Sequence, residues 1–297
     1  MARSELSRRL TVAAIGIPLV VFAVYVGRFV MGPVLAFFAA GAAWETYRLA
    51  EAGGIRPLRV PGIAAAAVLV LVAMVLPSAE AATPLLWITM LVLALLSSLL
   101  AIQLRGVEGH PLLAVAVTVF GALLPGGAMA YLVFLRHLDP GANMTALNAS
   151  TWSGLAGLAL VAYPLTATWL TDSAAFFAGK RWGRRRLIPR VSPGKTVEGA
   201  LAVLVGGLFG GWVVAHPVAG LWLGLEISPL AGAVGGLLIA GISQLGDLAE
   251  STWKREAGVK DSGSFFPGHG GILDRVDSLL FTVPVAYWWL SIFLGPT

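Results

Sequence analysis

Residues 251–277 form a dense polar run in an otherwise apolar chain. The stretch reads STWKREAGVKDSGSFFPGHGGILDRVD, with His269 between glycines and with Asp274 and Asp277 three residues apart. Ionisable groups at the edge of a hydrophobic segment are costly to bury and therefore indicate function. Carboxylates, basic side chains and consecutive glycines are what a site for a metal ion and phosphate requires. A simpler interpretation of Asp274 and Asp277 is that they cap the start of a helix and interact favourably with its dipole.

A second group lies just upstream, where an apolar segment ends in SQLGDLAE. Asp247, Glu250, Ser251 and Lys254 are spaced i, i+3, i+4 and i+7, so they share one face if the segment stays helical. For Glu250 and Lys254 the simpler interpretation is an ion pair at a solvated helix end. Asp247 is harder to explain in that way, because an aspartate that closes a long apolar segment is costly.

The glycines before Asp274 suit the binding of an anion. Gly270 and Gly271 let backbone N–H groups approach a ligand closely, and N–H groups at a helix start favour negative charge. We therefore expect a cation held by Asp247 and Asp274 that bridges phosphate oxygens. Mg²⁺ fits these oxygen ligands better than zinc, since the chain has no cysteine. His269 is then a phosphate contact or a proton donor, with a structural hydrogen bond as the simpler alternative.

A second polar segment reads TDSAAFFAGKRWGRRRLIPRVSPGKTVEG. Asp172 lies deep in an apolar segment, where an aspartate usually faces a partner or a polar cavity; an internal ion pair is the alternative. A cationic strip follows, and its simplest roles are to set the membrane topology and to attract anionic lipid head groups. The strip consists of Lys180, Arg181, Arg184, Arg185, Arg186 and Arg190.

The segment SPGKT, residues 192–196, is more specific than the strip before it. Ser192 is expected to cap a turn that Pro193 and Gly194 bend, and Lys195 and Thr196 are expected to point at a bound molecule. The segment is not a Walker A loop, because a proline stands where that motif requires its first glycine.

The composition is that of a polytopic membrane protein. The 297 residues are 58% hydrophobic, the mean hydropathy is +0.84, and 12% of residues are charged, against roughly 25% in soluble domains. The absence of cysteine excludes disulfides and thiolate metal sites. The net charge of +5 does not indicate nucleic acid, because the basic residues lie where membrane topology places them.

Nine segments are long and apolar enough to be spans, which need about 20 mostly apolar residues. They are residues 10–27, 30–47, 61–77, 84–104, 111–135, 153–178, 197–215, 229–249 and 278–294. With the N-terminus in the cytoplasm, eighteen of the twenty basic residues lie on the cytoplasmic side, and only Arg28 and Arg136 lie outside. This orientation also puts loops 179–196 and 250–277 in the cytoplasm together.

The predicted fold is all-α, a polytopic integral membrane helix bundle of about nine transmembrane helices with a cytoplasmic N-terminus. We expect residues 1–150 to be a scaffold for packing or dimerisation and residues 151–297 to be the catalytic region. Overlapping GxxxG pairs allow close helix packing within the chain or between protomers. They are formed by Gly206 and Gly210, Gly207 and Gly211, and Gly232 and Gly236.

The run from residue 251 to residue 277 resembles the signature of the phosphatidate cytidylyltransferases, also called CDP-diacylglycerol synthases. SPGKTVEG (192–199) and QLGDLAES (244–251) are similar to two further blocks of that family. The specific motifs cover residues 165–280, whereas the N-terminal half agrees only in being a set of spans. One departure is Trp253, where an aliphatic residue is more usual, and it should alter packing and leave the chemistry unchanged.

The resemblance implies that CTP and phosphatidic acid react to give CDP-diacylglycerol and pyrophosphate with Mg²⁺, and it leaves open a second cation. It implies a homodimeric enzyme of phospholipid synthesis in the bacterial inner membrane, with its active site facing the cytoplasm. By motif position Asp247 and Asp274 would be the metal ligands. Residues that contact phosphates or support those contacts would be Lys254, Arg255, Lys260, His269, Arg275 and Asp277. The nucleotide side would have Ser192, Lys195 and Thr196. We also expect the following residues to bind the substrates: Asp172, Glu250, Ser251, Gly270 and Gly271.

Elementary chemistry agrees with this reaction. The nucleophile would be an oxygen of a phosphate monoester, whose second pKa is about 6, so it is already anionic near neutral pH. The site therefore needs no strong general base, and its task is to hold two anions together and to spread the charge of the transition state.

Other functions make different demands on the sequence. Another enzyme that uses CTP or handles lipids, such as a polyprenol kinase or a CDP-archaeol synthase, stays open and is separated by an assay of nucleotide and acceptor. A transporter would spread its charges through the membrane depth, whereas here they gather at one face. The CDP-alcohol phosphotransferases carry an aspartate signature that is absent here. A non-catalytic lipid-binding scaffold would not need paired carboxylates beside His-Gly-Gly.

Overall fold

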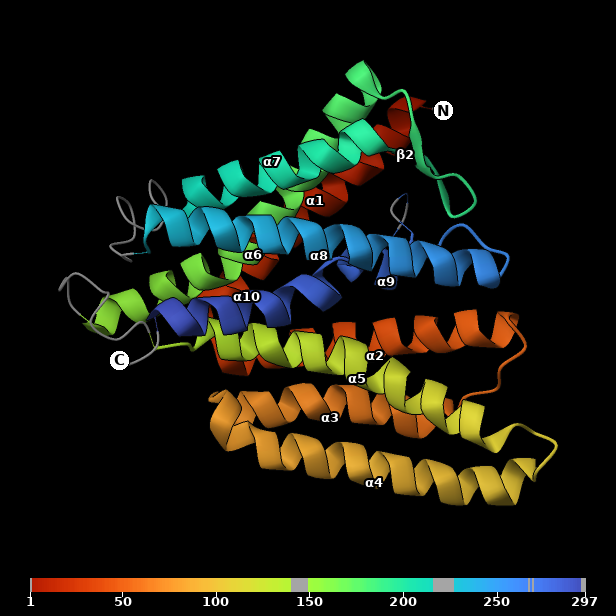
Figure 1. Ribbon diagram of the computed structural model, residues 1–297. Helices are drawn as coiled ribbons and strands as arrows, with labels where there is room; N and C mark the ends of the chain where they lie inside the picture. The colour runs from red at the N-terminus through yellow and green to blue at the C-terminus, as the bar shows by residue number, and fades with distance from the viewer. Residues whose placement is uncertain (1, 140–148, 216–226, 267, 269, 295–297) are drawn as a thin grey trace. The chain divides into compact units, whose positions relative to one another are not determined.

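The computed structural model describes residues 2–139, 149–215, 227–266, 268 and 270–294, and it leaves the side chains of 2–13, 105 and 149–154 undescribed. His269 therefore lies outside the described residues. The described chain is almost entirely helical, and its one sheet is a two-stranded hairpin (Figure 1). Helices satisfy their backbone polar groups internally, which hydrocarbon surroundings demand.

A helix lies at each of the nine segments expected to be spans. Five helical segments of the described residues are long and apolar enough to cross a membrane: Arg28–Ala52, Ala79–Leu104, Pro111–Arg136, Pro229–Glu256 and Leu273–Leu294. Ala14–Val26, Arg59–Val75 and Val197–Val213 are apolar but shorter. The protein is thus an all-α membrane protein, and the crossing of the bilayer by all nine helices stays a prediction.

The chain divides into two compact units, each made of two segments. Unit 1 comprises Met1–Phe134 and Trp253–Asp277, and unit 2 comprises Leu135–Thr252 and Ser278–Thr297. This division by compactness does not follow the boundary at residue 150 that the sequence suggested for scaffold and catalytic regions, and that division of roles stays a prediction.

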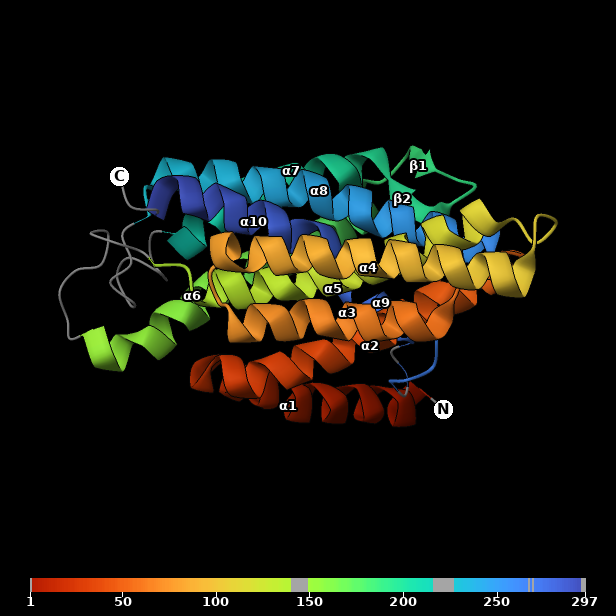
Figure 2. The same ribbon diagram turned by 90° about the horizontal axis from the view of Figure 1, so that it is seen from below.

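Unit 1 is built on α1 (Ala2–Val26), α2 (Arg28–Ala52), α3 (Arg59–Val75), α4 (Ala79–Arg105) and most of α5 (Pro111–Arg136). Helix α2 packs against both α1 and α3, and α3 packs against α4 (Figure 2). Tyr47 of α2 is fully buried and donates a hydrogen bond to the carbonyl of Thr118 in α5, at 2.7 Å. Its ring fits because Gly62 and Gly121 leave room where any Cβ would meet it.

Unit 1 also contains the end of α8 (Pro229–Glu256), the loop that follows it, and the one-turn helix α9 (Leu273–Val276), which packs against α2. Asp274 lies in the first turn of α9, at a helix start as the sequence indicated, whereas Asp277 follows the end of this helix, and a separate helix starts at Leu279.

Unit 2 contains α6 (Ala149–Trp182), β1 (Arg186–Ile188), β2 (Ser192–Thr196), α7 (Val197–Val213), most of α8, and α10 (Leu279–Leu294). Helix α6 packs along α7 and also contacts α10. Strands β1 and β2 pair antiparallel, with Arg186 opposite Thr196. The expected turn at Pro193–Gly194 is wrong, because both residues belong to β2; in a two-stranded hairpin each strand has a free edge, and such an edge tolerates proline.

The GxxxG pairs pack within unit 2. A Cβ added to Gly236 of α8 would lie 2.7 Å from the Cα of Gly211 and closer still to the carbonyl of Gly207 in α7. On the other face of α7, a Cβ at Gly206 would lie 2.8 Å from the Cβ of Ala174 in α6. The interpretation of these glycines as internal packing sites is thus confirmed, since small residues let helix backbones approach.

Candidate active site

A pocket of about 560 Å³ opens in unit 2 between α6, the β-hairpin, α7 and α8. Its volume lies within the range of about 300–1,000 Å³ that is usual for ligand sites. Four basic side chains and two acidic ones line it: Lys180, Arg184, Arg186, Lys195, Asp172 and Asp247. The pocket therefore unites the two polar stretches of sequence that end the sixth and eighth predicted spans, with an excess of positive charge.

The hairpin strand β2 leads directly into α7 and so brings Lys195 to the pocket. Thr196 is the N-cap of α7, and its hydroxyl accepts a hydrogen bond from the backbone N–H of Gly199 at 3.1 Å. Glu198 in the first turn of α7 accepts from the backbone N–H groups of Arg184 at 3.0 Å and Arg185 at 3.3 Å. These contacts fix the middle of the cationic strip to the start of α7. Ser192, at the far end of β2, is not among the residues that line the pocket.

Asp247 is held at the pocket by two neighbours. Its Oδ2 atom forms an ion pair with Lys195 Nζ, and Ser251 Oγ donates a longer hydrogen bond of 3.4 Å to Oδ1. The Lys195 and Asp247 side chains are 27% and 36% exposed, so both remain accessible to a molecule in the pocket. Asp172 reaches the same pocket from α6, which agrees with a polar cavity around it. Asp172 and Asp247 thus offer oxygen ligands of the kind that Mg²⁺ prefers.

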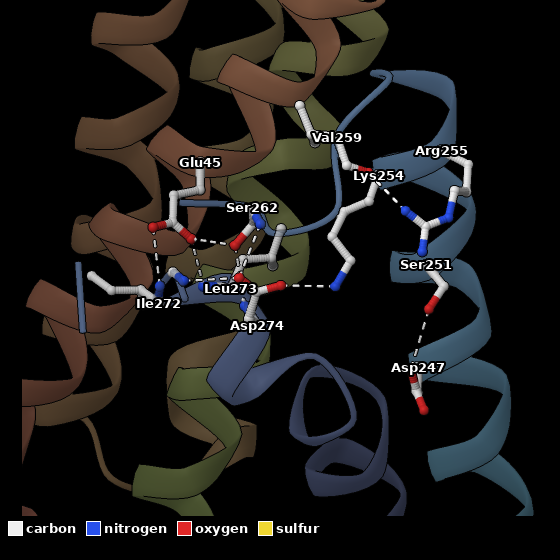
Figure 3. A network of polar contacts seen from close by, with 11 residues as sticks. Glu45, Asp247, Ser251, Lys254, Arg255, Val259, Ser262, Ile272, Leu273 and Asp274 are labelled. Atoms are coloured by element: carbon white, nitrogen blue, oxygen red, sulfur yellow. Dashed lines mark hydrogen bonds and ion pairs between the residues drawn. The ribbon is translucent and has the colours of Figure 1, made fainter. Parts of the chain in front are cut away.

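Asp274 has different surroundings, in unit 1 (Figure 3). Its side chain is 4% exposed, and Lys254 Nζ lies 2.7 Å from Oδ1. The backbone N–H groups of Ser262 and Gly271 donate to Oδ2 at 2.9 and 2.8 Å. The carboxylate therefore joins the end of α8, the following loop and the start of α9. Because Asp247 and Asp274 belong to different units, their joint hold on a cation stays a prediction.

A buried carboxylate that the sequence did not single out as functional lies beside this network. Glu45 of α2 is fully buried, and its two oxygens accept from the backbone N–H groups of Ile272 at 3.0 Å and Leu273 at 2.7 Å and from Ser262 Oγ at 2.7 Å (Figure 3). The sequence showed only a polar end to the second span. The available signal was a glutamate near the end of a predicted span, in GAAWET.

Gly270 and Gly271 of the HGG motif lie so close to neighbouring side chains that a larger residue would not fit at either position. Gly270 has a φ of +82°, a region that side chains disfavour, and a Cβ there would lie 2.6 Å from Asp274 Oδ2. A Cβ at Gly271 would collide with Glu45 and Ser262. In the described conformation the Gly271 N–H points to Asp274, so it serves the protein's own carboxylate.

The remaining predicted residues differ in exposure. Arg255, Lys260 and Arg275 are exposed, and Arg255 Nη1 donates to the carbonyl of Val259 at 3.0 Å. Glu250 is fully buried, and Asp277 is half-buried directly after α9. Helix α8 is continuous through residue 254, which confirms that residues 247, 250, 251 and 254 share one face of a helix.

Comparison with known proteins assigns the chain to a family. A family model described as the cytidylyltransferase family matches residues 7–293. The chain belongs to the cytidylyltransferase family. The match includes the loops of both units as well as the N-terminal helices, for which the sequence motifs carried no specific signal.

Several relatives of this chain are named phosphatidate cytidylyltransferase. One from Synechocystis is 37% identical over 195 residues, which are 61% of this chain and 63% of that relative. One from Bacillus subtilis is 37% identical over 182 residues, 60% of this chain and 59% of the relative. One from Haemophilus influenzae is 43% identical over 135 residues, 43% of this chain and 44% of the relative. The chain thus matches less than two thirds of the length of each.

Proposed function

We propose that this protein is a phosphatidate cytidylyltransferase, which transfers the CMP moiety of CTP to phosphatidic acid and releases pyrophosphate. The observation that carries the proposal is the pocket of unit 2, where basic side chains surround two carboxylates at the ends of membrane helices. Membership of the cytidylyltransferase family and the names of the relatives support the same reaction.

The triphosphate of CTP belongs in this pocket. Lys180, Arg184 and Arg186 line the pocket together with Lys195, which is paired with Asp247, so several cations border the space that an anion would fill. Guanidinium groups bind phosphate oxygens in pairs, and a lysine ammonium serves as a point charge. We place Lys195 at the phosphates, with Thr196 holding its strand against α7 and Ser192 nearer the edge of the hairpin.

The donor set fits a magnesium ion. Asp247 and Asp172 present hard oxygen ligands to the pocket, and the chain offers no thiolate. We propose that Asp247 holds the cation, that Asp274 contributes as the family resemblance implies, and that a second cation is accommodated beside them. When bound, Mg²⁺ neutralises phosphate charge and orients the reacting groups.

The chemistry requires little of the protein beyond position and charge. A phosphate oxygen of phosphatidic acid attacks the α-phosphorus of CTP and forms a new P–O bond. The bond to the β-phosphate breaks, and pyrophosphate leaves with that electron pair. Lysine and arginine side chains stabilise the charge that builds on the phosphoryl oxygens. We propose that the following residues either contact the phosphates or support the residues that do: Lys254, Arg255, Lys260, His269, Arg275 and Asp277. We also place Glu250, Ser251, Gly270 and Gly271 at the substrates.

The proposal includes a place in the cell. We infer nine membrane crossings with the N-terminus inside, in a bacterial cytoplasmic membrane, so that both charged loops meet CTP in the cytoplasm. The lipid substrate then comes from the surrounding leaflet. The homodimer implied by the resemblance also remains part of the proposal, although the GxxxG pairs pack within unit 2 and lend it no support.

The test is pyrophosphate release by the purified protein in detergent with CTP, phosphatidic acid and Mg²⁺, together with detection of CDP-diacylglycerol. We expect both products to form, EDTA to stop the reaction, and added Mg²⁺ to restore it. A polyprenol acceptor and an archaeal-type lipid, supplied in place of phosphatidic acid, separate this function from related ones. Product with either acceptor and none with phosphatidic acid would overturn the assignment.

Two variants link the reaction to the pocket. We expect Asp247→Asn to lower turnover on the order of 100-fold or more, because the carboxylate proposed to hold the cation at the phosphates is lost. Glu80→Gln is the matched control, since Glu80 is an exposed carboxylate in the first turn of α4. Normal turnover by Asp247→Asn would contradict the assignment of this pocket as the active site.

A further inference from the structure

Glu45 is the most extensively bonded buried carboxylate outside the residues to which the motifs assign chemistry. It comes from α2, more than two hundred residues before its partners, and it accepts hydrogen bonds from Ser262 Oγ and from the backbone of residues 272 and 273. A buried carboxylate is expensive unless hydrogen bonds satisfy it, and replacing such a group with an apolar residue often stabilises a protein. Stability alone is therefore a weak reason for a glutamate here.

The loop is shaped to receive this side chain. A Cβ at Gly263 would collide with Glu45 Oε1, and one at Gly271 would collide with Oε2. Two loop glycines thus admit the carboxylate, one beside each of its oxygens. Around it, Phe266 of the loop stacks on Phe38 of α2, with ring centroids 6.2 Å apart. The contact between α2 and the loop therefore combines the hydrogen-bonded Glu45 carboxylate with a stacked pair of aromatic rings.

Ser262 connects Glu45 to Asp274. Its hydroxyl donates to Glu45 Oε2 at 2.7 Å and accepts from the Asp274 backbone N–H at 3.3 Å, while its own N–H donates to Asp274 Oδ2 at 2.9 Å. One serine thus contacts both carboxylates, and Figure 3 shows its bonds to Glu45 and to Asp274. A shift of the loop away from Glu45 would move the groups that orient Asp274.

We propose that Glu45 is a positioning residue for cytidylyl transfer, which acts through Ser262 and the start of α9 to fix the orientation of Asp274 and of the loop residues around Ser262 and Ile272. The inference rests on the proposed function, because it assigns Glu45 to the same reaction. Glu45 itself touches neither substrate. Its effect is therefore expected in kcat, through the geometry of Asp274, and much less in the KM for CTP.

The decisive variant is Glu45→Gln, which keeps the shape of the side chain. An amide nitrogen can only donate, so a glutamine places one donor against the donors of the loop and loses at least one bond. We expect kcat to fall about 10- to 100-fold, the size of effect that a small misplacement of reacting groups produces. We expect Ser262→Ala to lower kcat in the same direction, and the effects of the two changes to be less than additive, since both act on one network.

Tryptic cleavage provides a readout that does not depend on activity. Lys260 is exposed in the loop that Glu45 anchors, and Arg190 is exposed in the other loop and serves as the internal reference. We expect Glu45→Gln to speed cleavage after Lys260 relative to cleavage after Arg190. The matched control is Tyr47→Phe, which removes a buried hydrogen bond of α2 to α5 and leaves the loop untouched. Tyr47→Phe should change the thermal midpoint and neither kcat nor the cleavage ratio.

Each outcome decides the inference. Glu45→Gln with kcat within about twofold of the wild type would overturn it, as would a lowered thermal midpoint with normal kcat per folded enzyme. If Glu45→Gln fails to fold, Ser262→Ala decides: lowered kcat supports the inference, and unchanged kcat overturns it. If the wild type makes no CDP-diacylglycerol, the proposed function fails, and an unchanged cleavage ratio would then also reject the anchoring of the loop by Glu45.

Discussion

At the scale of single residues, two aspartates that the motifs treat alike have different surroundings. Asp247 is partly exposed at a pocket and is paired with Lys195. Asp274 is buried and accepts from Lys254 and from two backbone N–H groups. An exposed ion pair contributes little to stability, whereas a buried acceptor that loses its partners costs considerably more. Substitution of Asp274 should therefore lower the stability of the protein more than substitution of Asp247, even if both residues are essential for turnover.

Asp274→Asn should abolish turnover and also lower stability, by about 1–3 kcal/mol. The amide nitrogen would face either Lys254 or the backbone donors of the loop, so one buried donor is left without an acceptor. Asp247→Asn, the paired variant, should lose turnover with almost no change in thermal midpoint. The measurement is the midpoint of thermal unfolding in detergent for both variants. Equal midpoints would show that the contacts of Asp274 do not hold the loop.

At the scale of helices, close packing in unit 2 depends on glycine. The carbonyl of Gly207 and the backbone of Gly211 lie where a side chain at Gly236 would have to go. Hydrocarbon surroundings supply no hydrophobic force between helices, so their association depends on such close approach. The crossing of α7 and α8 also sets the distance between strand β2, which carries Lys195, and Asp247 on α8. Packing at this crossing and the geometry of the pocket are thus coupled.

Gly236→Ala and Gly241→Ala form a matched pair on α8. At Gly236 the new methyl group meets backbone, so we expect a loss of about 1–3 kcal/mol from overpacking and reduced binding of CTP. At Gly241 no heavy atom lies within 4 Å of the added Cβ, so alanine should be neutral or should stabilise by up to about 1 kcal/mol through helix propensity. Thermal midpoints and the KM for CTP test both expectations. A Gly236→Ala protein as stable as the Gly241→Ala protein would contradict the packing argument.

At the scale of the whole molecule, the distribution of charge predicts how the chain lies in the membrane. Basic residues gather in the segments that an N-terminus in the cytoplasm would leave inside. The described helices agree in position with the nine predicted spans, and five helical segments meet the requirements of length and apolarity. The orientation itself follows from the charge rule and needs its own test.

The absence of cysteine makes that test direct. Ser78→Cys and Arg190→Cys each introduce one thiol at an exposed position. We expect a membrane-impermeant maleimide to label Ser78→Cys in spheroplasts and to label Arg190→Cys only after the membrane is opened. The reverse pattern would place the pocket outside, away from cytoplasmic CTP, and would refute the proposed topology.

The sequence by itself determined the membrane class, the approximate positions of the helices and the family, and it named Asp172, Lys195 and Asp247 as candidates. These follow from local quantities: apolar runs of sufficient length, charge beside them, and motifs read at fixed spacing. The tertiary structure alone decided that Asp172, Lys195 and Asp247 line one pocket, that the GxxxG pairs pack internally, and that Glu45 holds the loop before α9. Such facts depend on which distant segments touch, and a lone glutamate at the end of an apolar helix gives no spacing from which its partners can be read.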